Sequence, residues 1–192
     1  MKVGLFFGSF NPVHIGHMII ASHMVEYTDL AQVWMVVSPH NPLKEKVSLA
    51  RDNDRLHLVR LAIGENPKIK ASNVEFSLPL PSYTIDTLTF LKEKYPKKEF
   101  SLIMGGDNLD SLEKWKNYEL LLSDYDIYIY RRPGYANEKY TDMPRIRIVD
   151  APLLDISATF IRQAIMAGKS VRYLVPDAVF EYLENSNMYR RK

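Results

Sequence analysis

Residues 2–17 read KVGLFFGSFNPVHIGH, and this stretch decides the fold class that the sequence predicts. The run from Lys2 to Phe7 is almost continuously apolar, which is typical of a strand buried on both faces of a parallel sheet. Gly8 breaks the run, and a turn leads into a helical pattern that starts near Ile15. A buried strand followed directly by a turn and a helix indicates the first half of a βαβ unit.

The same alternation continues along the chain. Apolar runs that indicate strands lie at 3–7, 33–37, 69–71, 100–104, 127–130 and 146–149. Patterns that indicate helices lie at 15–27, 52–63, 84–94, 112–122, 159–166 and 177–183. We therefore predict an α/β protein with a doubly wound, mostly parallel sheet. In such a sheet the ligand crevice lies at the carboxyl ends of the strands, where the strand order reverses.

We expect a single domain over residues 1–192, with C-terminal helices from about residue 157 packed on it. The segments 39–46, 73–82 and 131–144 are rich in Pro, Gly, Asn and charge, and we interpret them as loops.

Composition excludes several classes of protein. Lys plus Arg number 25 against 23 Asp plus Glu, so the net charge is +2, too small for a surface that coats nucleic acid. The absence of cysteine excludes disulfides, thiolate metal sites and a cysteine nucleophile, and fits a reducing compartment. No apolar run is long enough to cross a membrane, and no leader pattern opens the chain, so we expect a cytoplasmic protein. The oligomeric state stays open, a homo-oligomer included.

The turn after the first strand has the features of an anion site. A glycine-containing turn and the start of a helix leave main-chain N–H groups without partners, and the helix end carries partial positive charge. His14 and His17 are three residues apart, so both imidazoles lie on one side of the first helical turn. Two ordinary histidines at a helix start, or a metal-binding pair, are the plainer readings of the same residues. The agreement of strand, turn, histidines and Gly16 favours a polyphosphate site.

A second motif reads DISATFIR over residues 155–162. Ser157 or Asp155 is a suitable N-cap, and Arg162 is one turn into the helix, where its guanidinium can add a charged fork for phosphate oxygens. Taken alone, this is more simply an N-capped helix with a surface arginine.

Together the two motifs resemble the (H/T)xGH and ISSTxIR signatures of the nucleotidyltransferase superfamily, and Asn11-Pro12 is similar to the (D/N)P that precedes the first. The chain departs from the second signature at Ala158, where a serine is usual, so one hydroxyl is missing while the main-chain donors remain.

Segments between the two signatures resemble the nicotinate mononucleotide adenylyltransferase family in particular. They are the proline-rich loop 38–44 ending in Lys44, the SYTIDTL stretch at 82–88, the GxD…W arrangement from Gly105 to Trp115, and the RPG at 132–134. The resemblance covers about residues 3–166.

The family resemblance implies a Rossmann-like nucleotidyltransferase fold. It also implies transfer of AMP from ATP to nicotinate mononucleotide, with Mg²⁺ on the ATP phosphates. His14, His17 and Arg162 are then the expected catalytic residues. Expected ATP-binding residues are Gly8, Ser9, Phe10, His14, His17, Gly105, Asp107, Ile156, Ser157, Thr159 and Arg162. Expected acceptor-binding residues are Lys44, Tyr83, Thr84, Trp115 and Arg132.

No protein ligands for a metal, no nucleic acid and no membrane are expected. Alternatives are an adenylyltransferase for nicotinamide mononucleotide or phosphopantetheine, and a nucleotide-binding module without turnover.

Overall fold

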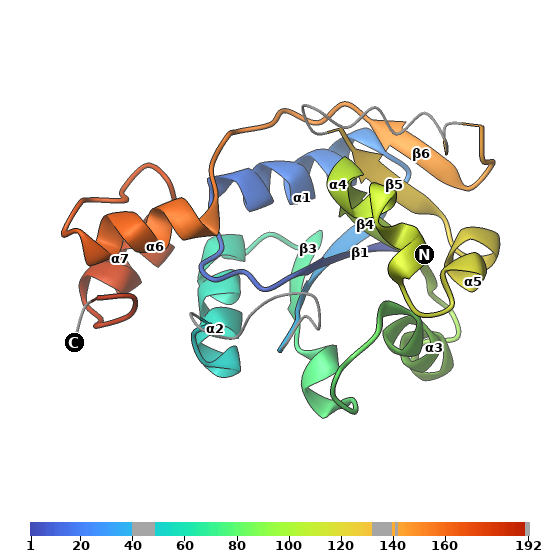
Figure 1. Cartoon of the computed structure of the whole chain (residues 1–192), viewed down its shortest axis with the longest axis horizontal. Helices are drawn as coiled ribbons and strands as arrows, with labels where there is room; N and C mark the ends of the chain where they lie inside the picture. Colours follow the sequence, from blue (N-terminus) through green and yellow to red (C-terminus); the bar gives the residue numbers. More distant parts are fainter. Residues whose placement is uncertain (40–48, 132–139, 141, 191–192) are drawn as a thin grey trace.

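The structure is a computed structural model that describes residues 1–39, 49–131, 140 and 142–190 (Figure 1). Within them the strands are β1 (Lys2–Gly8), β2 (Gln32–Val37), β3 (Ile69–Ser72), β4 (Glu99–Gly105), β5 (Ile127–Tyr130) and β6 (Ile146–Val149). They form one sheet in the order β3-β2-β1-β4-β5-β6, and every neighbouring pair is parallel. The order reverses between β1 and β4, so the doubly wound parallel sheet is confirmed.

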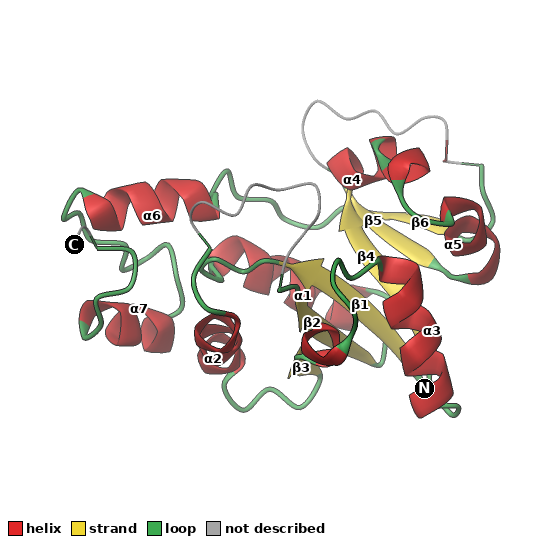
Figure 2. Ribbon diagram, turned by 60° about the horizontal axis from the view of Figure 1, so that its bottom comes forward, coloured by secondary structure: helices red, strands yellow, loops and turns green. Residues whose placement is uncertain are grey.

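Helices cover both faces of this sheet (Figure 2). They are α1 (Ile15–Tyr27), α2 (Asp52–Ile63), α3 (Thr84–Lys94), α4 (Gly106–Asp110), α5 (Tyr118–Asp124), α6 (Ala158–Met166) and α7 (Asp177–Glu184), with short 3-10 turns η1 (Val74–Ser77) and η2 (Leu112–Lys114). Successive side chains of a strand point to opposite faces, so Phe6 packs in the layer with α1 and α2, while Leu5 packs in the layer with α3 and α5.

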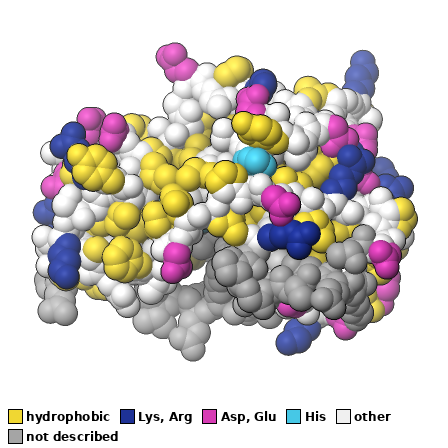
Figure 3. Space-filling view, turned by 90° about the horizontal axis from the view of Figure 1, so that it is seen from above, with side chains coloured by type: hydrophobic (Ala, Val, Ile, Leu, Met, Phe, Trp, Pro, Cys, Tyr) yellow, Lys and Arg dark blue, Asp and Glu magenta, His cyan; other side chains and the backbone are white. Residues whose placement is uncertain are grey.

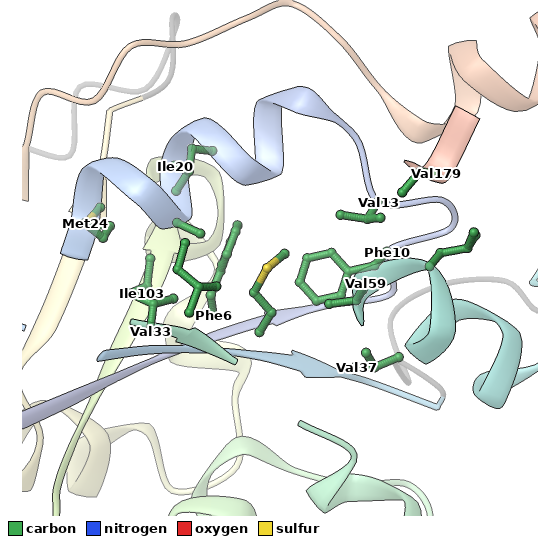
Figure 4. Close-up of a cluster of buried hydrophobic side chains, with 14 of the residues drawn as sticks. Phe6, Phe10, Val13, Ile20, Met24, Val33, Val37, Val59, Ile103 and Val179 are labelled. Carbon is green, nitrogen blue, oxygen red and sulfur yellow. The ribbon is translucent and has the colours of Figure 1, made fainter. Parts of the chain in front are cut away.

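The C-terminal helices extend the first of these layers. Val179 of α7 lies in the same buried cluster as Val13 and Val59, and the three side chains are close together in Figure 4. Seen from above, exposed apolar side chains gather on the part of the molecule where α6 and α7 lie (Figure 3), and Phe160 of α6 is 54% exposed. That the whole chain forms one domain stays a prediction, which this shared cluster supports.

The helix expected over 112–122 is interrupted, and only its part from Tyr118 onward is α-helical. The chain forms only the 3-10 turn η2, then passes through a left-handed residue, Asn117 (φ 52°), before α5 begins at Tyr118. Asparagine tolerates this conformation, and the break lets Leu112 and Leu121 both reach the core. The sequence also did not indicate α4, whose five residues are too few to show a helical period.

No helix in the described ranges is long and apolar enough to span a bilayer.

Candidate active site

The turn after β1 is compact because Phe10 folds back under it. A Cβ at Gly8 would lie 2.8 Å from two ring carbons of Phe10, so position 8 admits only glycine without movement of the ring. Phe10 adopts φ 43° and is buried, and its ring meets that of His17 edge-on with the centroids 5.0 Å apart. The aromatic ring thus supports both the turn, which includes Ser9, and one of the two motif histidines.

His14 and His17 lie together, as the three-residue spacing predicted. Their rings stack with the centroids 3.6 Å apart and the planes 26° from parallel. His14 occupies the N-cap position of α1, and its main-chain N–H donates to Nδ1 of His17 at 3.2 Å. Since Nδ1 accepts, we assign the proton of a neutral His17 ring to Nε2, which makes that nitrogen a donor.

Gly16 explains the glycine of the first motif. A Cβ at this position would lie 3.2 Å from Cε1 and Nδ1 of His14, tighter than ordinary van der Waals contact. The His14 ring therefore lies against the glycine backbone in a buried position. A side chain at position 16 would displace this ring from its stack on His17.

Arg162 brings the second motif to the first across 151 positions of sequence. Its Nη1 donates to the main-chain oxygen of Asn11 at 2.8 Å, and its Nη2 donates to Oγ1 of Thr159 at 3.2 Å. Ser157 is the N-cap of α6, as predicted, and accepts from the N–H of Phe160 at 3.2 Å. Ile156, just before the cap, packs partly buried against the first core layer. The start of α6 and the turn after β1 are therefore neighbours.

Asn11 joins three distant segments, which the sequence did not reveal. Besides its contact with Arg162, its Oδ1 accepts from the hydroxyl of Tyr189 at 2.7 Å and from the N–H of Ala50 at 3.1 Å. Burial raises the pKa of Tyr189 well above its ordinary value, so this phenol is a neutral donor at physiological pH. The end of the chain thus helps to hold the turn.

Gly105 and Asp107 lie at the same edge of the sheet as Gly8. Gly105 is the last residue of β4, next to β1, and is also the N-cap residue of α4. Asp107 lies in the first turn of α4. Both positions follow from the strand order, because the carboxyl ends of parallel neighbours meet at one edge.

Two of the expected acceptor-binding residues, Tyr83 and Thr84, lie at the start of α3. The helix begins at Thr84 with Tyr83 as its N-cap residue, so neither Ser82 nor Thr84 caps it. Lys116 pairs with Asp86 at 2.8 Å and lies over the Tyr83 ring at 4.9 Å. The adjacent Trp115 is partly buried against the second core layer.

Lys44 and Arg132 lie outside the described residues. Two charged residues that the sequence did not single out lie at the same edge, Arg55 and Glu75, and both are buried. Arg55 follows the polar pattern of an exposed helix face and carries no signal of burial. Glu75 lies between Val74 and Phe76, and an acidic residue flanked by apolar residues is a weak signal of burial.

The described ranges contain no group of three or more His, Cys, Asp or Glu side chains arranged to hold a metal ion. A Mg²⁺ ion that is carried on the phosphates of a substrate usually keeps several waters and needs few protein ligands.

A family model described as Cytidylyltransferase-like matches residues 5–164, and with the parallel sheet it places the protein in the nucleotidyltransferase class. A protein of Flavobacterium johnsoniae named "Probable nicotinate-nucleotide adenylyltransferase" is 53% identical over 100% of both chains, and one of the same name from Cytophaga hutchinsonii is 52% identical over 98% of each. The chain belongs to the nicotinate-nucleotide adenylyltransferase family.

The fold has solved counterparts. The structure of Plasmodium falciparum nicotinic acid mononucleotide adenylyltransferase complexed with NaAD superposes with a TM-score of 0.82, 19% identity, and coverage of 98% of this chain and 97% of that one. At this identity the likeness concerns the fold, and it confirms the Rossmann-like nucleotidyltransferase architecture.

Proposed function

We propose that this protein transfers AMP from ATP to nicotinate mononucleotide, giving deamido-NAD and pyrophosphate. The observation that carries the proposal is the contact of Arg162 with Asn11, which unites both signature motifs around the stacked pair His14 and His17. The full-length relatives named as nicotinate-nucleotide adenylyltransferases support the choice of acceptor.

The reaction needs placement and charge stabilisation rather than a protein nucleophile. A phosphate oxygen of the mononucleotide, already an anion at pH 7, attacks the α-phosphorus of ATP, and the bond from that phosphorus to the bridging β-oxygen breaks. Negative charge shifts to the α-phosphoryl oxygens and to the departing pyrophosphate. Preorganised donors at those oxygens supply most of the acceleration in such transfers.

We assign these donors to the edge described above. His14, His17 and the N–H groups of the turn after β1 would face the α-phosphoryl group and the leaving pyrophosphate. Arg162 and the start of α6 would hold the terminal phosphates, since a guanidinium binds phosphate with two parallel hydrogen bonds. Gly105 and Asp107 would line the nucleoside side of the ATP site. Bound Mg²⁺ would add charge neutralisation at the phosphates.

The acceptor's ring would bind at the start of α3. The first N–H groups of a helix have no intrahelical acceptor, and those near Tyr83 and Thr84 have the positive end of an eleven-residue helix behind them. A pyridine carboxylate can accept from both, whereas the NH₂ of a carboxamide meets donors with donors. One unpaired buried donor costs ~1–3 kcal/mol, so we expect at least about tenfold preference for the acid. Trp115 would stack on the ring, and Lys44 would contact the phosphate of the acceptor. The family resemblance implies that Arg132 also binds the acceptor.

Pyrophosphate release with ATP, Mg²⁺ and a panel of acceptors tests the proposal. Nicotinate mononucleotide, nicotinamide mononucleotide and phosphopantetheine are compared singly, and the two pyridine mononucleotides then compete at equal concentration to give the ratio of kcat/KM. Release with none of them overturns the activity, and a competition ratio near one overturns the carboxylate site. Trp115→Ala is the matched control, because stacking is worth ~1 kcal/mol for either ring and its loss leaves the ratio unchanged.

A further inference from the structure

Two charged side chains at the carboxyl edge are almost entirely buried and have no part in the proposed transfer. Arg55, near the start of α2, is 0% exposed, and Glu75, in η1, is 3% exposed. An apolar group of similar volume often serves stability as well as a buried charge does. Stability is therefore a weak reason for either residue to be charged, and their contacts indicate another one.

Arg55 binds main-chain oxygens from separate segments of the chain. Its guanidinium donates to four carbonyl groups, those of Ser9, Ser38, Pro39 and Ala50. The bond to Ser38 measures 2.9 Å, and a further bond to the carboxylate of Asp52 measures 2.6 Å. Ser9 belongs to the turn after β1, and Ser38 and Pro39 follow β2. A rigid planar fork of five donors thus fixes the ends of two neighbouring strands to each other.

Glu75 contacts hydroxyl groups, whereas Arg55 contacts carbonyl groups. Its carboxylate accepts from Oγ1 of Thr87 at 2.9 Å, and the hydroxyls of Ser38 and Ser82 lie close enough to favour its charged form. Burial raises the pKa of Glu75, and the three hydroxyl hydrogen bonds act in the opposite direction, in favour of the carboxylate. Ser82 and Thr87 flank the start of α3, so Glu75 holds the segment that carries the proposed acceptor site.

Ser38 joins the two charges into one path. Its carbonyl accepts from Arg55, its hydroxyl contacts Glu75, and its N–H donates to the oxygen of Gly8 at 3.0 Å. Contacts therefore lead from the turn after β1, through Arg55, Ser38 and Glu75, to the first turn of α3.

We infer that Arg55 and Glu75, linked by Ser38, are positioning residues that hold the ATP-binding turn and the acceptor-binding start of α3 at the separation that the transfer requires. The inference rests on the proposed function. Each half-site has its own groups for its own substrate, so a looser link leaves both binding steps intact. In-line attack depends on the distance between the two bound substrates, and a misplacement of about 1 Å can cost about 10²-fold in rate.

Three substitutions weaken the path without removing any proposed contact to substrate. Ser38→Ala deletes only the hydroxyl that reaches Glu75, and Glu75→Gln keeps the shape but loses the charge. Arg55→Lys keeps the charge but has three donors for four carbonyl groups. Matched controls are Ser77→Ala in η1 and Arg60→Lys on α2, both at exposed positions.

The measurements are kcat, and the dissociation constants of ATP and of nicotinate mononucleotide taken separately by calorimetry. We expect kcat to fall about tenfold or more in Ser38→Ala and Glu75→Gln, with both dissociation constants within about twofold of the parent protein and the controls unchanged. A fall in kcat below about threefold in these two variants overturns the inference. So does a fall that comes with an equal loss of binding, because that pattern belongs to a generally loosened site. Ser38→Ala keeps the test valid where Arg55→Lys fails to fold.

A double-mutant cycle tests whether the path is one unit. If Ser38→Ala and Glu75→Gln act through the same hydrogen bond, the double variant loses about as much kcat as the worse single variant. Losses that multiply instead overturn the single link. The parent protein separates this inference from the proposed function: no pyrophosphate with any acceptor refutes the function, whereas normal turnover in both the parent and the variants refutes only the inference.

Discussion

The two ends of the sheet use buried charge in opposite ways. At the amino end, charged side chains pair directly with one another. Nζ of Lys2, the first residue of β1, lies 2.6 Å from Asp126 and 3.0 Å from Asp29, while Arg147 and Arg145 approach the same carboxylates at 3.2 and 3.3 Å. At the carboxyl end, Arg55 has one carboxylate partner, Asp52, but most of the contacts of Arg55 and Glu75 are with main-chain carbonyls and hydroxyls.

We expect this difference to separate a stabilising end of the sheet from a reactive one. Ion pairs at the amino end tie the starts of β1, β5 and β6 together. At the carboxyl end the buried charges shape loops, and the motif histidines and helix starts lie beside them. Substitutions at the carboxyl end are therefore expected to change turnover, and those at the amino end to change the free energy of unfolding.

The largest effect is expected for His17→Ala. His17 is assigned a donor at Nε2 beside the turn after β1, and loss of one preorganised donor typically costs ~10²–10³ in turnover. We expect kcat to fall by that factor while the affinity for ATP changes little, measured by pyrophosphate release and calorimetry. His23→Ala on the same helix is the control. A kcat near the parent value would contradict the assignment of the reaction to the carboxyl end of the sheet.

A smaller effect is expected for Arg162→Lys. The variant keeps the charge but loses the fork that binds two phosphate oxygens, and one charge-assisted hydrogen bond contributes ~1.5–3 kcal/mol. ATP affinity should therefore fall at least about tenfold, while AMP affinity falls much less. Titration of both nucleotides into both proteins measures this, with Arg172→Lys as control. Equal losses for AMP and ATP would contradict the assignment of Arg162 to the terminal phosphates.

The smallest effect on turnover is expected at the amino end, for Asp126→Asn. Loss of the Asp126 charge leaves the largely buried Lys2 ammonium with a weaker partner. This costs ~1–3 kcal/mol at neutral pH, which corresponds to a midpoint lower by several degrees. We expect kcat per folded molecule to stay within about twofold. Thermal unfolding of this variant and of the exposed control Asp124→Asn measures the loss.

The pH dependence of that loss has a definite sign. Burial alone would raise the pKa of Asp126, but the hydrogen bond and charge of Lys2, with Arg147 and Arg145, outweigh it and hold this pKa below its ordinary value. The stabilisation is therefore complete above about pH 4, the ordinary pKa of an aspartate, and is lost as the pH falls through the lowered one. The gap in unfolding midpoint between parent and variant should shrink on acidification below pH 4. A gap that widens there would contradict the ion-pair explanation.

Local sequence patterns were enough to predict most of the strands and helices. The strand runs around Leu5, Met35 and Ile129 were visible because a strand buried on both faces is apolar at every position. The prediction of one helix over 112–122 was wrong in its first half because the sequence EKWKN continues a helical composition. Only the burial of Leu112 and Leu121 requires the break at Asn117. Propensity is a weak prior where tertiary packing decides.

In the candidate site too, some features depend on local sequence and others on tertiary contacts. The sequence by itself determined the parallel sheet, the turn after β1 with its two histidines, and the capped helix that carries Arg162, because each depends on neighbours within about one turn of chain. Only the tertiary structure decided that Arg162 and Tyr189 both meet Asn11, and that Ser38 connects Arg55 to Glu75. These contacts join segments that the strand order brings to one edge. A residue that binds carbonyls of distant loops carries no periodic signal, because its partners are main-chain atoms that every sequence contains.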